Sequence, residues 1–241
     1  MLEDINKCED KFISLFSKKF KFSNNLIKYE DEIVNDMYDH NYFKHNKNTS
    51  IKEVIDAYHY QIEKGDDFLK LISQVKLNSK IVKTLGLEET IILTMLHNKK
   101  TINFKINEFV KIKDVTINDL NKIELKHYGK LYGETFILRR NKEFIKTSRK
   151  HSNFRYIGAY INDKIVGACH FYTYKNYTCL DSLIVDNRYR HKYIASALIK
   201  YVLDNSENLY LHADNREEVK NMYKKLGFKK VAETYEYLKT I

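Results

Sequence analysis

Residues Leu183–Leu198 read L-I-V-D-N-R-Y-R-H-K-Y-I-A-S-A-L and join an apolar strand, a basic turn and a helix. Leu183–Val185 is typical of a buried strand, and polar turn residues end it at Asp186. From Ile194 onward, apolar residues recur at helical spacing. The N-terminus of such a helix offers unpaired backbone N–H groups and a partial positive charge, which the basic turn reinforces. The segment therefore predicts a site that holds a phosphate group.

The residues around this segment predict further strands and helices of an α/β domain. Alternation of apolar and polar residues indicates strands, and capping residues mark the ends of a helix. The expected elements are a hairpin at 156–167 with its turn at Asn162-Asp163, a strand at Leu209–Ala213, a helix capped by Asn215 and Glu218 that ends at Gly227, and a final strand from Val231.

Two motifs in this arrangement resemble those of the GCN5-related N-acetyltransferase (GNAT) superfamily. Its acetyl-CoA signature, Arg/Gln-x-x-Gly-x-Gly/Ala, reads Arg190-His-Lys-Tyr193-Ile-Ala195 here. Its later tyrosine–x3–Gly–Phe element reads Tyr223-Lys-Lys-Leu-Gly227-Phe228. The resemblance spans roughly residues 109–238, and it implies the mixed α/β GNAT fold with an acetyltransferase domain at 106–241.

The resemblance also implies a cofactor site that binds acetyl-CoA and contains no metal. The residues assigned to it lie on the apolar strand, in the basic turn, at the start of the helix and before the last helix: Ile184, Val185, Arg190, His191, Lys192, Tyr193, Ile194, Ala195 and Asn215.

The phosphate turn departs from the superfamily pattern at two positions. Glycine commonly stands where this chain has His191 and Tyr193, and glycine permits close backbone approach to a pyrophosphate or unusual φ and ψ angles. The superfamily's asparagine before the tyrosine falls on Arg216, so Asn215 is one residue early. An alternative interpretation is a degenerate domain that no longer binds the cofactor.

Enzymes of this superfamily let an amine attack the acetyl thioester directly while both substrates are bound. The resemblance implies that Tyr223 donates a proton to the leaving thiolate, although a tyrosine there could be a core residue with its hydroxyl bonded. Asp181 is the candidate base for the ammonium. It could instead bind a cationic substrate or lie exposed at a strand edge. His212 is the alternative base, or a structural strand residue.

Composition indicates a globular protein of 241 residues with 43% hydrophobic residues. The sequence has no run of eighteen apolar residues and no signal-peptide pattern at its start, so we expect a cytoplasmic protein without membrane spans. Its three cysteines, Cys8, Cys169 and Cys179, have no zinc or disulfide spacing. Cys169 and Cys179 fall in expected neighbouring strands, which favours core thiols over nucleophiles.

The net charge of +10 is concentrated in the part of the chain that carries the phosphate turn. Residues 1–105 contribute +1 and residues 106–241 contribute +9. A basic half can attract the anionic coenzyme A. Basic residues also gather on an expected helix between Arg139 and Lys150, which suits either a solvated helix face or nucleic acid. No nucleic-acid motif accompanies them, so nucleic acid is the weakest of the candidate partners.

The first hundred residues predict a diverged second copy of the same fold. The order of elements is helix, strands, helix, strand, helix, strand, and Lys83–Leu87 (K-T-L-G-L) parallels Lys224–Phe228 (K-K-L-G-F). Asn46–Ser50 precedes the first helix of this copy without arginine or glycine, so no phosphate turn is expected there. We expect a domain at 1–100, with a linker near 98–107.

These observations favour an N-acetyltransferase that transfers the acetyl group of acetyl-CoA to a primary amine, most simply that of a small molecule. The alternative is a catalytically silent module that binds coenzyme A or a partner. The sequence leaves the acceptor open among polyamines, amino acids, aminoglycosides, protein N-termini and lysine, and it leaves the oligomeric state open.

Overall fold

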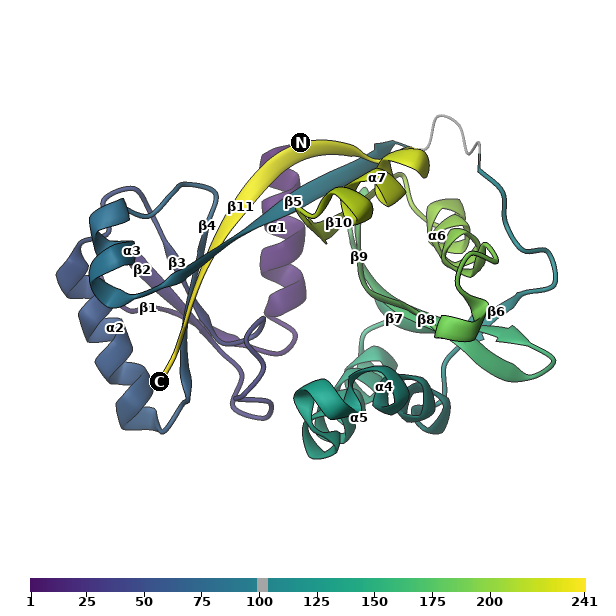
Figure 1. The fold of residues 1–241 in the computed structure, drawn as a ribbon, viewed down its shortest axis with the longest axis horizontal. Coiled ribbons are helices and arrows are strands. Elements are labelled where there is room, and N and C mark those ends of the chain that lie inside the picture. The colour runs from purple at the N-terminus through teal and green to yellow at the C-terminus, as the bar shows by residue number, and fades with distance from the viewer. Residues whose placement is uncertain (99–103) are drawn as a thin grey trace. The chain divides into compact units, whose positions relative to one another are not determined.

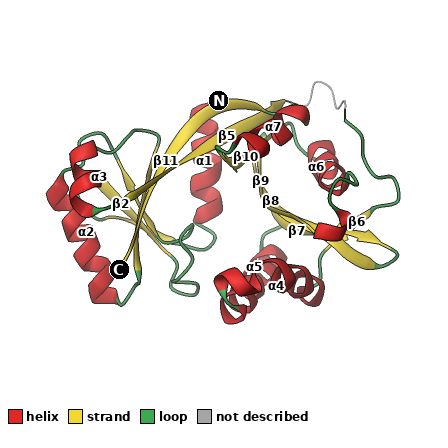
Figure 2. Ribbon diagram, in the orientation of Figure 1, coloured by secondary structure: helices red, strands yellow, loops and turns green. Residues whose placement is uncertain are grey.

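The computed structural model describes residues 1–98 and 104–241, which form a mixed α/β fold (Figures 1 and 2). The chain divides into two compact units. Unit 1 consists of Met1–Lys11, Met95–His212 and Arg216–Val231. Unit 2 consists of Phe12–Thr94, Ala213–Asn215 and Ala232–Ile241.

These units are not the contiguous ranges 1–100 and 106–241 that the sequence predicts. Most of the first helix belongs to unit 1, and the end of the last strand belongs to unit 2 because it pairs there with another strand. Both chain ends thus belong to the unit that is distant from them in sequence. Of the expected linker at 98–107, residues 99–103 lie outside the described residues.

Unit 1 contains a mixed sheet with helices on both faces. Its strands lie in the order β5-β10-β9-β8-β7-β6. Helix α5 covers the face that carries His170, and α6 covers the face at Gly167 (Figure 1). The elements are α1 (Leu2–Ile13), the end of β5 (Glu88–Asn98), β6 (Lys111–Asp114), α4 (Ile117–Tyr132), α5 (Glu134–Lys150), β7 (Phe154–Ile161), β8 (Lys164–Tyr174), β9 (Tyr177–Val185), the 3-10 helix η1 (Asn187–Tyr189), α6 (Ile194–Asp204), β10 (Asn208–Asp214) and α7 (Glu217–Lys225).

Unit 2 repeats the strand pairing of unit 1. In unit 1, β7, β8 and β9 pair antiparallel in succession and β9 pairs parallel with β10. In unit 2, β1, β2 and β3 pair antiparallel and β3 pairs parallel with β4. The elements are β1 (Lys18–Lys21), β2 (Leu26–Glu30), β3 (Tyr42–His45), α2 (Ile51–Lys64), β4 (Phe68–Ser73), α3 (Ser79–Leu85), the start of β5 and the end of β11 (Lys229–Thr240). The expectation of a duplicated fold is confirmed at the level of strand order.

Most of the elements expected from sequence form within a residue or two of their predicted limits. The hairpin turns at Asn162 and Asp163, whose positive φ values of 47° and 57° fit a type I′ turn. The predicted cap of the last helix is wrong by one residue: α7 begins after Arg216, and no side chain of the described residues caps it. Cys169 and Cys179 are buried, as expected of core thiols, and Cys8 is buried as well. Among the described residues, no helix is long and apolar enough to cross a membrane.

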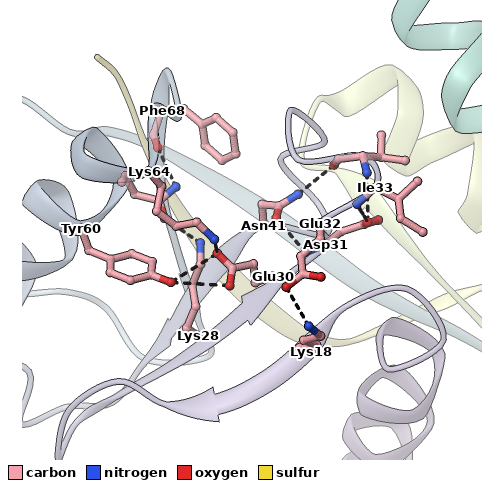
Figure 3. Close-up of polar contacts among 12 residues, drawn as sticks. Lys18, Lys28, Glu30, Asp31, Glu32, Ile33, Asn41, Tyr60, Lys64 and Phe68 are labelled. Carbon is pink, nitrogen blue, oxygen red and sulfur yellow. Dashed lines mark hydrogen bonds and ion pairs between the residues drawn. The ribbon is translucent and has the colours of Figure 1, made fainter.

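The interior of unit 2 contains a fully buried lysine. The Lys28 side chain on β2 donates a hydrogen bond to Gln61 Oε1 at 2.7 Å and lies 4.5 Å from the centre of the Phe43 ring. Nearby, Glu30 accepts from Tyr60 and pairs with Lys64 (Figure 3). Burial lowers the pKa of Lys28 to about 8, because few groups around the ammonium replace its lost hydration.

We expect the stability difference between Lys28→Met and the wild type to depend on pH. The native pKa lies below the unfolded value of about 10.4, so the unfolded chain binds more protons above pH 8 and the stability contributed by this site rises with pH. Between pH 7 and 9.5 the wild type should therefore gain about 2 kcal/mol relative to the variant. Urea unfolding of both proteins at the two pH values measures this gain, and a constant difference would contradict it.

Candidate active site

Strand β9 separates from β10 where the site begins. Their parallel ladder runs from Tyr177 paired with Asn208 to Leu180 paired with Leu211. Beyond it, β9 has a bulge against β8: Ala168 pairs with Ile184 and His170 with Asp181, so two residues of β9 oppose one of β8. Ser182 in this bulge has a φ of 52°. Residues 183–185 therefore extend past the ladder with a backbone edge turned away from β8.

The basic turn after β9 adopts the backbone conformation that its sequence seemed to disfavour. His191 and Tyr193 have φ values of 60° and 58°, in the left-handed region that glycine usually occupies. Tyr193 is the N-cap residue of α6 and caps it with its backbone alone. The residue is 50% exposed. The helix N-terminus consequently keeps the N–H groups of its first turn available for an anion.

Asp186 holds the turn against helix α4. Its carboxylate caps η1 by accepting from the backbone N–H of Arg188 at 3.0 Å. It also pairs with the Arg188 guanidinium at 3.1 Å and with Lys126 Nζ at 2.6 Å. Hydrogen bonds from Arg188, followed by those from Lys126, hold the pKa of Asp186 well below its usual range. The carboxylate is therefore ionised at any pH at which the protein would function.

The Tyr223-to-Phe228 spacing follows from a Schellman motif at the end of α7. The Gly227 N–H donates to Lys224 O and the Phe228 N–H donates to Tyr223 O, both at 3.0 Å. Gly227 has the left-handed φ of 88° that this motif needs. The Phe228 ring contacts the rings of Tyr223 and His97, at centroid distances of 5.7 and 5.3 Å. The motif thus fixes the position of Tyr223.

We expect Gly227→Ala to destabilise unit 1 by about 2–4 kcal/mol, because two costs add. A side chain at φ 88° is strained, and its Cβ would lie 2.7 Å from His97 Nε2. Chemical denaturation measures the loss. Gly86→Ala is the matched control, since Gly86 ends α3 at φ 61° with nothing within 4 Å. An equal loss in both variants would show that His97 imposes no constraint.

These segments line one cavity of about 880 Å³ in unit 1. Its lining residues come from β9, the basic turn, the start of α6, the end of α7 and part of α4. The predicted site residues that line it are Ile184, Val185, Arg190, His191, Tyr193, Ile194, Ala195 and Tyr223. The other lining residues are His127, Tyr128, Leu183, Asn187, Tyr189, Ser196, Met222, Lys225 and Leu226.

Three predicted site residues do not line this cavity. The Lys192 ammonium lies 5.2 Å from the Tyr189 ring centre. The backbone carbonyl of Lys192 accepts a hydrogen bond from Asn107 Nδ2 at 2.9 Å. Asn215 belongs to unit 2, and α7 starts one residue later than the sequence indicated. The Asp181 side chain is 60% exposed, on the strand segment before the bulge.

Tyr223 has an environment that keeps its hydroxyl protonated. Burial raises its pKa to about 12, and the charge of Asp181 adds to the effect. Tyr128 on α4 contributes to the same electrostatic environment. Sequence reasoning missed Tyr128 and His127, since no motif marks them and only the tertiary fold brings α4 to the cavity.

The candidate bases on the strands differ in their partners. Asp181 Oδ2 lies 3.6 Å from Nε2 of His170. His212 on β10 contacts the Glu9 carboxylate on α1. Because the His212 ring is engaged in that pair, its geometry favours the structural alternative.

Comparison with known proteins identifies a domain and a fold. The family model described as the acetyltransferase (GNAT) domain matches residues 152–230. A functionally unknown conserved protein from Staphylococcus epidermidis has a TM-score of 0.79 at 17% identity, over 96% of this chain and 97% of its own. A GCN5-related N-acetyltransferase from Kribbella flavida has a TM-score of 0.65 at 9% identity, over 97% and 93%.

A third structure has a duplicated domain. It is a tandem GNAT protein from the clavulanic acid biosynthesis pathway, with a TM-score of 0.54 at 9% identity, over 89% of this chain and 78% of its own. At these identities the likeness shows the fold, and it confirms the expected mixed α/β GNAT architecture. No curated protein sequence matches the chain significantly.

Proposed function

Because residues 152–230 of this chain match the family model described as the acetyltransferase (GNAT) domain, we propose that the protein transfers the acetyl group of acetyl-CoA to a primary amine of a small molecule. One observation carries the proposal. The N-terminus of α6, which no side chain in the described part of the chain caps, lines the same cavity as Tyr223, whose hydroxyl is protonated. The chain enters this helix through left-handed backbone at His191 and Tyr193.

The residues of the cavity suit the parts of acetyl-CoA. The N–H groups at the start of α6 and the Arg190 guanidinium would bind the pyrophosphate. The free edge of residues 183–185 would pair with the extended pantetheine arm, as an added strand pairs with a sheet edge. A volume of about 880 Å³ is within the usual range for such ligands. Bound acetyl-CoA supplies an activated thioester.

Tyr223 would act by hydrogen bonding to the developing thiolate. A thiol has a pKa of about 8.5, below the value of about 12 for Tyr223, so complete proton transfer from the tyrosine would be uphill. A fixed O–H donor still stabilises negative charge that develops in the transition state. Asp181 is the candidate residue that interacts with the ammonium of the acceptor, either by accepting its proton or by binding its charge.

Unit 2 lacks both features, so we propose one cofactor per chain. Its helix α2 corresponds to α6 in the repeated strand order, but the Ser50 and Glu53 side chains form a capping box that occupies this N-terminus. Helix α3 ends in the same motif as α7, with the Leu87 N–H donating to Val82 O. Val82 therefore occupies the position of Tyr223.

Calorimetric titration and an acetylation assay test the proposal. We expect acetyl-CoA to bind with a stoichiometry of one and, at a hundred times its Kd, to stabilise the protein by about 2.7 kcal/mol. Thiol release is then measured with spermidine, lysine, kanamycin and a tripeptide. Binding without turnover on any of these amines would favour the silent coenzyme A-binding module. Absence of binding would reject both functions.

A further inference from the structure

A polar row crosses three strands of unit 1 and ends at Asp181. In the register of the sheet, Tyr156 on β7 pairs with His170 on β8, and His170 pairs with Asp181 on β9. Side chains that pair in this way lie on the same face. At one end, the Tyr156 hydroxyl donates to Glu124 Oε1 at 2.7 Å, and Glu124 pairs with Arg140. At the other end, His170 Nε2 lies 3.6 Å from Asp181 Oδ2.

The imidazole of His170 is held in one place by aromatic rings. Its side chain is 2% exposed. The rings of Phe144, Phe154 and Tyr156 surround it edge to face, at centroid distances of 5.3, 5.4 and 5.1 Å. A ring packed in this manner has little rotational freedom, so its Nε2 presents a fixed partner to the Asp181 carboxylate.

Asp181 differs from the rest of the row because it is accessible. Its side chain is 60% exposed, at the bulge before the cavity-lining residues 183–185. The Ser182 N–H donates to Asp181 Oδ1 at 2.5 Å and so restrains the second oxygen. Other titratable groups that interact with Asp181 are the buried thiols of Cys169 on β8 and Cys179 on β9, His212 on β10, which pairs with Glu9 on α1, and Tyr223 on α7.

The carboxylate remains ionised in this setting. Desolvation alone would raise the pKa of Asp181. The side-chain and electrostatic interactions with His170, together with the Ser182 N–H, have a larger effect and lower this pKa well below its usual range. Such a carboxylate is a weak proton acceptor, and it is a strong partner for a cation.

We propose that Asp181 binds the ammonium of an aliphatic amine acceptor and that His170 is the positioning residue that fixes it there. The assignment rests on the proposed function and deepens it, because an aliphatic amine is cationic at neutral pH while an aromatic amine is not. The ammonium first gives one proton to water, and the neutral nitrogen then forms a bond to the thioester carbonyl carbon. As the carbon–sulfur bond of this tetrahedral adduct breaks, the nitrogen loses its second proton, which protonates the thiolate that leaves beside Tyr223.

The first test reads the pair without turnover. In protein labelled with 13C at the aspartate carboxyl carbons, the Asp181 signal is assigned by its loss in Asp181→Asn. We expect it to remain that of a carboxylate at pH 4 in the wild type. In His170→Phe, which preserves the aromatic packing, it should titrate near the ordinary value of about 3.9. Identical titration in the two proteins would overturn the role of His170, whether or not the protein is an enzyme.

The second test uses the amine of highest turnover from the assay above. Asp181→Asn and His170→Phe should each raise the KM for the amine about tenfold or more, with kcat changed less than threefold. The double variant should be no worse than Asp181→Asn alone, because His170 acts through Asp181. His170→Gln, which keeps a donor, should recover most of the loss. Additive losses would instead assign His170 a purely structural role.

Two comparisons keep the test decisive. His45→Phe removes an equally buried imidazole from unit 2, and we expect its KM to equal that of the wild type. If His170→Phe does not fold, Asp181→Asn still tests the anchor, since its side chain is largely exposed. An unchanged KM in that variant would overturn the proposal. Absence of turnover in the wild type would refute the proposed function and leave the carboxyl titration as the test of the pair.

Discussion

Tyr223→Phe should lower kcat by about 100- to 1,000-fold while the Kd for acetyl-CoA changes less than threefold. The loss is the amount expected when one preorganised donor to a developing negative charge is removed. In this variant the backbone of residue 223 still belongs to the Schellman motif, and its ring still packs against Phe228. The cavity therefore keeps its shape. Steady-state kinetics with the best amine and calorimetric titration with acetyl-CoA measure the two quantities separately.

A matched control for this variant is Tyr58→Phe. Tyr58 lies on α2 in unit 2, where it packs against the hydrophobic core, and its substitution should leave kcat unchanged. If Tyr223→Phe retains full turnover, the tyrosine is a core residue, as the sequence allowed. A loss of acetyl-CoA affinity equal to the loss of kcat would instead indicate that the hydroxyl contributes to binding.

Local signals in the sequence were sufficient to predict the elements that build the site. The apolar run, basic turn and helical periodicity of 183–198 correspond to β9, η1 and α6. The Gly227 signal predicts the end of α7, because only a residue tolerant of positive φ completes the Schellman motif. The repeated K-x-L-G pattern predicts the duplication because the same motif ends α3.

Features that depend on tertiary contacts were out of reach of such signals. Strand β11 contributes to unit 2 through pairing with β4, which no local pattern encodes, so contiguous domains were the natural expectation. Helix α4 brings His127 and Tyr128 to the cavity without a motif. The pairing of Asp181 with His170 requires the register of β8 and β9, and the one-residue bulge in β9 makes that register unpredictable from alternation.

The turn at His191 and Tyr193 shows a limit of another kind. Residue preference argues against left-handed backbone at both positions, because a non-glycine residue pays roughly 1–2 kcal/mol there. The structure nevertheless has that conformation at both. Ion pairs of Asp186 with Lys126 and Arg188 restrain the start of the turn, and the buried Ile194 anchors its end in the core. These contacts oppose the local cost, and propensity alone does not include them.

Arg190→Glu should weaken acetyl-CoA binding at least about 100-fold. The substitution removes a charge-assisted contact to phosphate and places a carboxylate at the mouth of an anion site. At a ligand concentration of a hundred times the wild-type Kd, the wild type should gain about 5–10 °C in Tm. The variant, then near its own Kd, should gain only about 1–2 °C. Thermal unfolding with and without acetyl-CoA measures both shifts.

Lys200→Glu makes the same change in net charge on the exposed side of α6, where Lys200 pairs with Asp204 at 2.7 Å. It should retain the full thermal shift, because its distance from the cavity leaves only a screened interaction with the ligand. An equal loss in the two variants would mean that overall charge, rather than a site at Arg190, attracts the cofactor. A shift that survives Arg190→Glu would place the pyrophosphate away from the basic turn, since a charge reversal within a phosphate site cannot be neutral.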